Sequence, residues 1–78
     1  MSNEKEILDR LVHHENWEVR FEVARQEYGL DVLVNDEDWR VRYEVAKQGY
    51  GLNKLINDKS ALVADMAARK IQELKLKE

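Results

Sequence analysis

The stretch from residue 39 to residue 48 carries its apolar side chains at helical spacing. At 100° per residue, Trp39, Val41, Tyr43, Val45 and Ala46 sweep a wide arc of one helix. An arc of this width is typical of a helix with neighbours on two sides. The charged residues that the pattern places on the opposite, solvent side are Arg40, Glu44 and Lys47.

Cap and turn residues limit this helix to about ten residues. Asp36 and Asp38 precede it and are suitable N-caps, because a carboxylate accepts hydrogen bonds from the free N–H groups of the first turn. After Gln48 the segment "GYG" predicts the end of the helix, since glycine readily adopts the left-handed geometry of helix C-termini. The next segment, "LNKLIND", spaces its apolar residues as one further helical turn. This stretch therefore predicts one helix followed by a short second helix of α or 3₁₀ type.

This pattern occurs twice, because residues 11–32 and residues 33–54 align with a shift of 22. The 13 identical pairs among the 22 positions are Leu11/Leu33, Val12/Val34, Glu15/Glu37, Trp17/Trp39, Val19/Val41, Arg20/Arg42, Glu22/Glu44, Val23/Val45, Ala24/Ala46, Gln26/Gln48, Tyr28/Tyr50, Gly29/Gly51 and Leu30/Leu52. A third copy, residues 55–76, keeps Leu55, Asn57, Asp58, Val63, Ala68 and Leu74. There the Trp, Arg and Tyr of the pattern become Ala61, Ala64 and Asp65, so this copy is degenerate. Such periodicity predicts units that stack on one another.

Both ends of the chain predict capping helices with a polar outer face. Asn3 and Glu6 form a capping-box pattern at the start of an amphipathic helix over about 3–13. Ser60 is the predicted cap of a longer helix that runs to about residue 76. The apolar stripe of that helix is Leu62, Val63, Met66, Ala67, Ile71 and Leu74. We therefore expect a complete small protein with one domain, 1–78, that comprises the N-terminal helix, copies 11–32 and 33–54, and a degenerate copy with its capping helix over 55–78.

Length and composition narrow the classes of protein. The chain has 78 residues and no Cys, so neither a disulfide framework nor a thiolate zinc site supports its small core, which favours a reducing compartment and a cytoplasmic protein. No segment has the roughly 18 apolar residues of a membrane span, and "MSNEKEILDR" lacks the pattern of a signal peptide. A net charge of −3 with 37% charged residues disfavours nucleic acid as a partner.

The chain offers no set of residues for catalysis, and we expect neither an enzyme nor a bound metal or cofactor. His13 and His14 point about 100° apart on a helix, so the pair is interpreted as a solvated helix end and not as a metal site. The side chains of the Ser/Thr type, Ser2 and Ser60, are near neither His in the pattern. The sequence contains no Gly-rich phosphate loop, and carboxylates such as Glu44 fall on the predicted solvent side.

The segment "LVNDEDWRVRYEVA" resembles the Asp-x-x-x-x-Val-Arg-x-x-Val-Ala signature of HEAT-like α-helical repeats. The short copy with its second small helix looks most like the variant leucine-rich repeat, in which α-helices alternate with 3₁₀ turns. The resemblance covers roughly residues 5–74, although the copies are shorter than usual and contain no Pro. It implies an all-α fold, namely a short right-handed α-solenoid of 22-residue units with capping helices at both ends. It also implies a curved surface that binds proteins and, in a minority of cases, DNA, and it implies no reaction.

Two arginines fall inside the apolar arc, where a guanidinium needs acceptors because its desolvation is costly. These are Arg20 and Arg42, and the natural partners are Asp36 and Asp58, one at each junction between copies. The favoured interpretation, which the resemblance also implies, is a structural Arg/Asp ladder; the alternative is a phosphate- or partner-binding role for the arginines. The predicted core around the ladder is Trp17, Val19, Val23, Ala24, Leu30, Leu33, Trp39, Val41, Val45, Ala46, Leu52, Leu55, Val63 and Ala67.

Aromatic residues supply the candidate binding surface. Two pairs recur one copy apart: Trp17/Phe21 and Trp39/Tyr43. Core packing is the favoured interpretation of these pairs, and the alternative is a partly exposed strip of the kind that forms binding hot spots. A tyrosine also lies beside a Gly in the loop after each helix, where we expect an exposed rim. The predicted partner-binding residues are Tyr28, Tyr50, Phe21, Tyr43, Arg40, Lys47 and Glu44.

Surface positions differ between the copies while the framework repeats. The differing pairs include Glu18/Arg40, Arg25/Lys47, Asp31/Asn53 and Val32/Lys54. This divergence favours a non-enzymatic scaffold that binds a protein of unknown identity, for example a small inhibitor or adaptor such as a phage- or mobile-element-encoded antagonist of a bacterial enzyme. The alternative is a nucleic-acid-binding repeat protein that uses Arg25, Arg40, Lys47 and Lys54. A homodimer is a further alternative, because a two-fold interface between two copies would extend the thin core of a short stack of helices.

Overall fold

The computed structural model describes residues 3–77, and within them the chain is helical with no strand. Six helices follow one another: α1 Glu4–Leu11, α2 Trp17–Arg25, α3 Leu30–Leu33, α4 Trp39–Lys47, α5 Leu52–Leu55 and α6 Ala61–Leu76. The predicted all-α class is therefore confirmed. None of these helices is long and apolar enough to cross a membrane.

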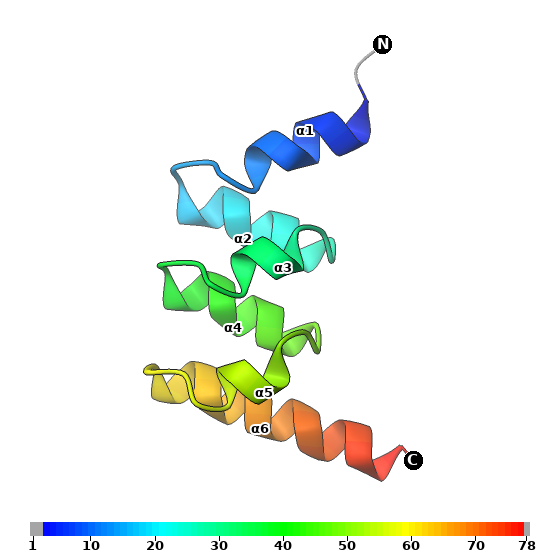
Figure 1. Cartoon of the computed structure of the whole chain (residues 1–78), viewed down its shortest axis with the longest axis vertical. Helices are drawn as coiled ribbons and strands as arrows, with labels where there is room; N and C mark the ends of the chain where they lie inside the picture. The colour runs from blue at the N-terminus through cyan, green and yellow to red at the C-terminus, as the bar shows by residue number, and fades with distance from the viewer. Residues whose placement is uncertain (1–2, 78) are drawn as a thin grey trace.

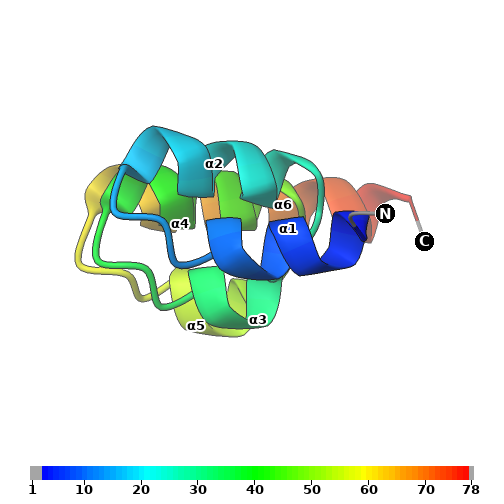
Figure 2. The same cartoon turned by 90° about the horizontal axis from the view of Figure 1, so that it is seen from above.

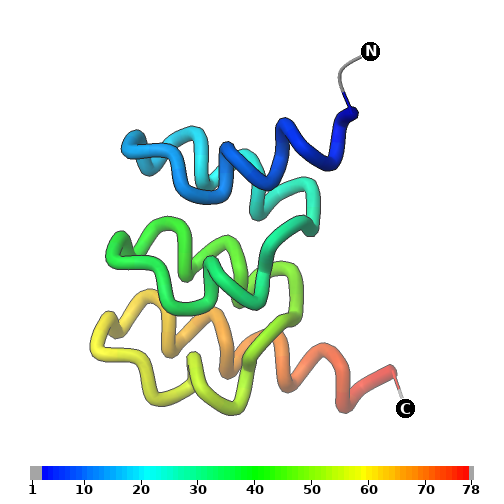
Figure 3. Tube along the Cα trace, turned by 45° about the horizontal axis from the view of Figure 1, so that its top comes forward, coloured from blue at the N-terminus to red at the C-terminus, as the bar shows by residue number. Residues whose placement is uncertain are grey.

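Helices α2, α4 and α6 lie side by side in one row, and the short helices α3 and α5 form a second layer beside it (Figure 1, Figure 2). Helix α1 lies at the N-terminal end of the row and contacts α2. The chain runs back and forth between the two layers and advances along the row with each unit (Figure 3). The longest dimension of the molecule, 44 Å, follows the row. The middle helix α4 packs against α2 on one side and α6 on the other, as its wide apolar arc requires.

The three helices of the row begin at equivalent positions, but their caps differ. Asn16 and Asp38 each accept a 2.9 Å hydrogen bond through Oδ1 from the backbone N–H two residues later. Ser60 has the same extended backbone at the start of α6, yet its side chain makes no cap hydrogen bond. The predicted position of the cap is therefore confirmed, but the Ser60 side chain does not cap the helix. Instead, the Ser60 N–H donates to Asp58 Oδ1 at 2.8 Å.

Helix α1 is shorter than the predicted range of about 3–13, because it ends at Leu11 and the chain then turns back toward the row. Asn3 Oδ1 accepts a hydrogen bond from the Lys5 N–H at 2.9 Å. A capping box would direct this bond to the N–H of Glu6, so the cap is present but its predicted partner is wrong.

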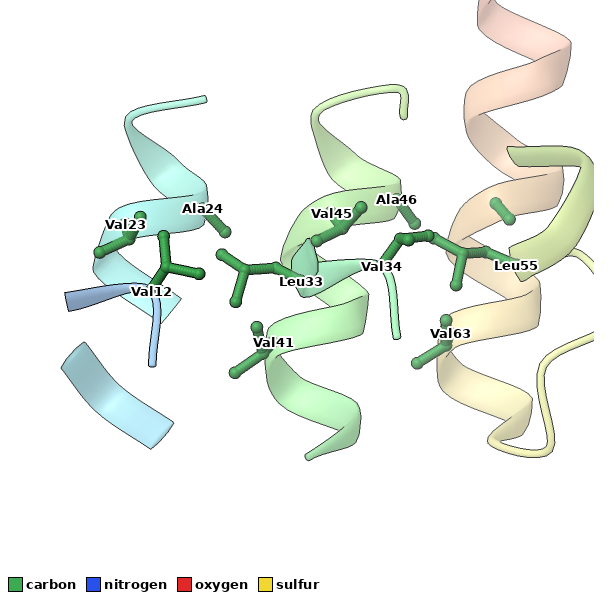
Figure 4. Packing of buried hydrophobic residues seen from close by; sticks show 11 residues of the cluster. Val12, Val23, Ala24, Leu33, Val34, Val41, Val45, Ala46, Leu55 and Val63 are labelled. Atoms are coloured by element: carbon green, nitrogen blue, oxygen red, sulfur yellow. The ribbon is translucent and has the colours of Figure 1, made fainter. Parts of the chain in front are cut away.

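Eleven aliphatic residues form one continuous core (Figure 4). They are Val12, Val23, Ala24, Leu33, Val34, Val41, Val45, Ala46, Leu55, Val63 and Ala67. Ala24 and Ala46 are fully buried, and such small side chains allow the helices of the row to approach closely. The predicted core omitted Val12 and Val34, which come directly after α1 and α3.

Several predicted core residues lie at the edge of this core instead. Trp39 is 40% exposed. On α4 it points about 160° away from the buried Val41, and so it faces away from the second layer. The predicted core residues that are half-buried are Trp17, Val19, Leu30 and Leu52. The two tryptophans thus lie at the edge of a core that consists of Leu, Val and Ala side chains.

Glu44 is the clearest departure from the predicted solvent side, because the structure buries it to 3% exposure. Its equivalent one copy earlier, Glu22, is exposed. Helix α4 has row neighbours on both sides, whereas α2 has α4 on one side and a smaller contact with α1 on the other. The Glu44 carboxylate accepts a 2.6 Å hydrogen bond from Gln48 Nε2. It is therefore wrong as a partner-binding residue.

Gly29 and Gly51 connect each longer helix to the short helix that follows. Their φ angles are +65° and +64°, a left-handed backbone that is costly for residues with a Cβ. A Cβ on Gly29 would lie 2.6 Å from Val12 Cγ2, and one on Gly51 would lie 2.6 Å from Val34 Cγ2. The same contact therefore links successive units, which explains why this Gly and this Val recur together.

Helix α6 breaks the pattern because it continues where α2 and α4 stop. Glu73 takes the position of Gly51 in the third copy, and α6 runs through it without a left-handed turn. The predicted apolar stripe of α6 is wrong for Leu62 and Leu74, which are 56% and 44% exposed. Leu62 takes the position of Arg40 on the outward side of the row, which is the side that faces away from the second layer. Leu74 belongs to the C-terminal end of α6, which extends beyond the second layer (Figure 1).

Candidate functional site

A groove of about 280 Å³ lies on the outward side of the helix row. Six residues line it: Trp17 and Phe21 from α2, Trp39, Arg40 and Tyr43 from α4, and Leu62 from α6. We call these six residues the aromatic groove. Its walls belong to α4 and to the two helices that pack against α4, so the groove is built on helices and not on loops.

Each half of the aromatic groove contains one edge-to-face aromatic pair. The rings of Trp17 and Phe21 are 6.0 Å apart at an interplanar angle of 80°. Those of Trp39 and Tyr43 are 6.2 Å apart at 90°. The spacing of four residues places each pair on one helix face, and the edge-to-face geometry favours the ring quadrupoles. Phe21 and Tyr43 also pack against the core, which holds the two pairs in place.

Arg40 covers the Trp17 ring from the next helix. Its guanidinium carbon lies 3.7 Å from the ring centroid, within the range of a cation–π interaction. Asp38 holds the guanidinium there through two hydrogen bonds, from Nε at 2.9 Å and from Nη2 at 2.8 Å. Asp38 also caps α4, so one carboxylate sets both the start of the helix and the position of Arg40.

The Asp38–Arg40 pair changes the pKa values of both groups in the direction that favours their charges. The hydrogen bond from Arg40 lowers the pKa of Asp38, against the effect of partial burial. The same bond raises the pKa of Arg40. Arg40 is therefore a fixed cation that already has two partners, one carboxylate and one indole ring.

Replacing Asp38 with asparagine is expected to flatten the loss of stability in acid. The folded-state pKa of Asp38 lies below its unfolded value, so this carboxylate stabilises the fold above about pH 4 and loses its contribution as the pH falls through the folded pKa. Asparagine keeps the cap but does not titrate. Urea denaturation between about pH 7 and about pH 2 should show a smaller loss of unfolding free energy in D38N than in the wild type.

The control for this prediction is Asp31→Asn at an exposed position outside the aromatic groove. An identical pH dependence in D38N and the wild type would contradict the assigned ion pair. Some acid sensitivity should persist in D38N. Burial tends to raise the pKa of Asp58, but its hydrogen bonds from Arg42 and the Ser60 N–H outweigh burial and lower it.

The second half of the groove lacks this cation. In the third copy Leu62 takes the position of Arg40 and Ser60 takes that of Asp38, so neither the guanidinium nor its carboxylate recurs. Trp39 is accordingly 40% exposed. The predicted stripe placed Leu62 inside the protein, whereas it lines the groove. Leu62 aligns with Arg40 in the repeat, and the sequence assigns Arg40 to the outer surface. This alignment is the signal that could have placed Leu62 on the surface.

The four residues of the predicted ladder lie together in two pairs of nearly the same geometry. Arg20 Nε donates to Asp36 Oδ2 at 2.7 Å, and Arg42 Nε donates to Asp58 Oδ2 at 2.8 Å. In each pair Nη2 donates to the other carboxylate oxygen at 3.1 Å, and Nη1 donates to a backbone carbonyl at 2.6 Å, that of His14 or Asp36. Both arginines are buried, so these protein groups occupy their donors.

The two loop tyrosines differ in exposure. Tyr28 is half-buried, packs against the core, and donates a hydrogen bond from its hydroxyl to the Asp9 carboxylate. That bond raises the pKa of Tyr28. Tyr50 is 41% exposed. The predicted rim is therefore wrong for Tyr28, and neither tyrosine is among the residues that line the aromatic groove.

The cations of the nucleic-acid alternative do not lie on one element. Arg25 ends α2 and forms an exposed ion pair with Glu22 at 2.9 Å. Lys47 ends α4, Lys54 lies in α5, and both are exposed. Arg40 is held over Trp17. Each of the two arginines thus has an acidic partner, which reduces the positive charge available to a phosphate backbone.

Within residues 3–77, no cluster of three or more His, Cys, Asp or Glu side chains could hold a metal ion. His13 and His14 are exposed, and His14 Nδ1 accepts a 3.0 Å hydrogen bond from the Asn16 N–H. Ser60 begins α6, and Ser2 lies outside the described residues. Polar clefts of about 440 Å³ and 430 Å³ also lie at the two Arg/Asp pairs, but their buried arginines already donate to protein acceptors, so the aromatic groove is the stronger candidate site.

The chain matches none of the protein-family models, curated proteins and solved structures with which it was compared.

Proposed function

We propose that the chain is a short right-handed α-solenoid of HEAT-like or variant leucine-rich-repeat type, built from 22-residue units. Three arrangements that recur from one copy to the next support this proposal. They are the buried Arg/Asp pairs, the contacts between a left-handed Gly and a Val, and the edge-to-face aromatic pairs. Ion pairing, backbone geometry and ring packing are independent of one another, so their shared period favours a structural repeat over a chance similarity of sequence.

We infer that the function of the protein is to bind another protein without catalysis, as a cytoplasmic inhibitor or adaptor. The aromatic groove is the observation that carries this inference. It brings the exposed Trp39 and Leu62, 40% and 56% accessible, together with four further residues on one row of helices. Exposed apolar surface with a polar rim marks interaction sites, and Trp, Tyr and Arg are enriched among binding hot spots.

The proposal changes the set of binding residues that the sequence predicts. Phe21, Arg40 and Tyr43 belong to the aromatic groove. Trp17, Trp39 and Leu62 also belong to it, although the residue pattern favours interior positions for all three. Lys47 is exposed near the end of α4, and a partner that covers the groove could reach it.

Replacing Leu62 with glutamate is expected to abolish partner binding with little effect on the fold. The side chain is 56% exposed, and a charge there would be desolvated by any apolar surface that covers the groove. The matched control is Leu74→Glu, which places the same charge on the same helix outside the groove. Affinity capture from a nuclease-treated lysate of the source cells should recover a protein with the wild type and L74E, and at least tenfold less with L62E.

Two results would contradict the proposal. Equal recovery by L62E and L74E would show that the groove is not the binding surface. Recovery of nucleic acid alone from untreated lysate, with loss at moderate salt, would favour the nucleic-acid alternative. Circular dichroism of each variant shows whether the fold is intact. If the partner proves to be an enzyme, inhibition of its activity by the wild type but not by L62E would identify an antagonist, including one encoded by a phage or mobile element.

A further inference from the structure

We propose that the Trp39 half of the aromatic groove binds an arginine side chain of the partner protein. The guanidinium would stack on the exposed Trp39 ring as Arg40 stacks on Trp17. This inference rests on the proposed protein-binding function, and it specifies the chemistry of the group that the groove accepts.

The chain itself provides the template for this contact. Trp17 and Trp39 begin α2 and α4 at equivalent positions, and each is paired with an aromatic residue one turn later in nearly the same geometry. The first ring holds a guanidinium 3.7 Å from its centroid, on the side that faces the next helix of the row. Leu62 of α6 lines the groove together with Trp39 and takes the position of Arg40, but it is too short and apolar to supply a cation.

The Trp39 half of the groove lacks an internal cation because the degenerate third copy has neither the arginine nor the aspartate of the second copy. Arg40 needs Asp38 to hold it, and α6 carries Leu62 and Ser60 at these positions. A planar guanidinium can stack on an indole face and still bind acceptors at its edge, which an ammonium group does less well. The groove therefore has an indole face of the kind that holds Arg40, without the internal side chain that would occupy it.

Of the six residues that line the groove only Arg40 is charged, and its charge is paired with Asp38. Asp65 occupies in α6 the position that Tyr43 has in α4, so it lies on the outward side of the same row. Its carboxylate is 60% exposed and pairs with Arg69 at 3.1 Å, a surface pair that a partner can exchange at little cost. The net charge of −3 attracts cationic partners over a longer range and disfavours anionic ones.

The first test uses the tripeptide acetyl-Gly-Arg-Gly-amide and its citrulline analogue, which has nearly the same shape but no charge. Nuclear magnetic resonance separates the indole N–H signals of the two tryptophans, and Trp→Phe variants assign them. We expect the Trp39 signal to shift saturably at millimolar peptide, with at least threefold tighter binding of the arginine peptide, while the Trp17 signal shifts little. Equal affinity for the two peptides, no saturable shift, or a larger shift at Trp17 would overturn the proposal.

The second test rebuilds the missing cation inside the chain. The double variant Ser60→Asp/Leu62→Arg copies Asp38 and Arg40 onto α6, and its own guanidinium should cover Trp39. We expect it to bind the arginine peptide at least fivefold more weakly than the wild type, whereas Leu74→Arg, which adds the same charge elsewhere on α6, should bind it within about twofold. Equal weakening in both variants would indicate general charge repulsion and would overturn the proposal.

The two proposals fail in different ways. If L62E loses the captured protein but the wild type does not distinguish arginine from citrulline, the protein-binding function stands and the arginine anchor is wrong. If the arginine peptide binds at Trp39 but no protein is captured through the groove, the cation site stands as chemistry and the proposed function is wrong.

Discussion

Replacing Arg42 with alanine is expected to lower the free energy of unfolding by about 3–5 kcal/mol, because Asp58 would keep its charge in a buried site without its cationic partner. The two side chains are only 7% and 6% exposed, and three hydrogen bonds hold the guanidinium. A core of this size rarely provides more than about 3–5 kcal/mol of net stability. Urea denaturation followed by circular dichroism should therefore find R42A largely unfolded at 25 °C.

Two further variants distinguish the effect of burying the ion pair on stability from the effect of removing a charge. Arg25→Ala removes one partner of an exposed pair and should cost less than about 1 kcal/mol. The double variant Arg42→Met/Asp58→Leu removes both buried charges and should recover most of the stability that R42A loses. If R42A were as stable as R25A, the Arg42–Asp58 pair would not support the junction between α4 and α6.

Replacing Gly51 with alanine is expected to cost about 2–5 kcal/mol through two effects. The left-handed backbone disfavours a residue with a Cβ by about 1–2 kcal/mol, and the new Cβ would lie 2.6 Å from Cγ2 of the buried Val34. Overpacking of this kind typically costs a further 1–3 kcal/mol, at the rough precision of such values. Thermal and urea denaturation should both report the loss.

Gly49→Ala is the matched control, since it shares the strain without the clash. Gly49 also has a positive φ, +87°, but a Cβ there would meet only Lys70 Cε at an ordinary 3.6 Å. G49A should therefore lose less stability than G51A. Adding Val34→Ala to G51A should not restore the wild-type value, because it removes the clash but leaves the strain and a cavity. Equal losses in G49A and G51A would show that the Gly51–Val34 contact is unimportant.

Local signals in the sequence predicted most of the helices. Helix α4 runs from Trp39 to Lys47, close to the range that the cap at Asp38 and the glycines after Gln48 indicate. The short helices follow Gly29 and Gly51, where the backbone is left-handed. These features depend on residues within a few positions of one another, and so a single sequence contains the information that sets them.

The buried arginines were also predictable, because a charge inside an apolar arc requires an acceptor and the chain repeats one Asp per junction. The exposure of individual side chains on the helix surface was less predictable. Trp39 and Glu44 both depend on what lies beside α4 in the row, since Trp39 faces outward and Glu44 lies on a helix with two neighbours. Helical periodicity gives the direction of a side chain but does not say which directions are covered.

Local backbone preferences and the cost of burying charge set the helical class, the positions of the turns and the chemistry of the Arg/Asp pairs, and all three can be derived from the amino-acid sequence. Tertiary packing decided which apolar residues form the core and which form the aromatic groove. That decision depends on the packing of α2, α4 and α6 in one row, which places Arg40 over Trp17 and leaves Trp39 beside Leu62. Contacts between residues in neighbouring copies produce this difference, and residue patterns within a single helix do not contain it.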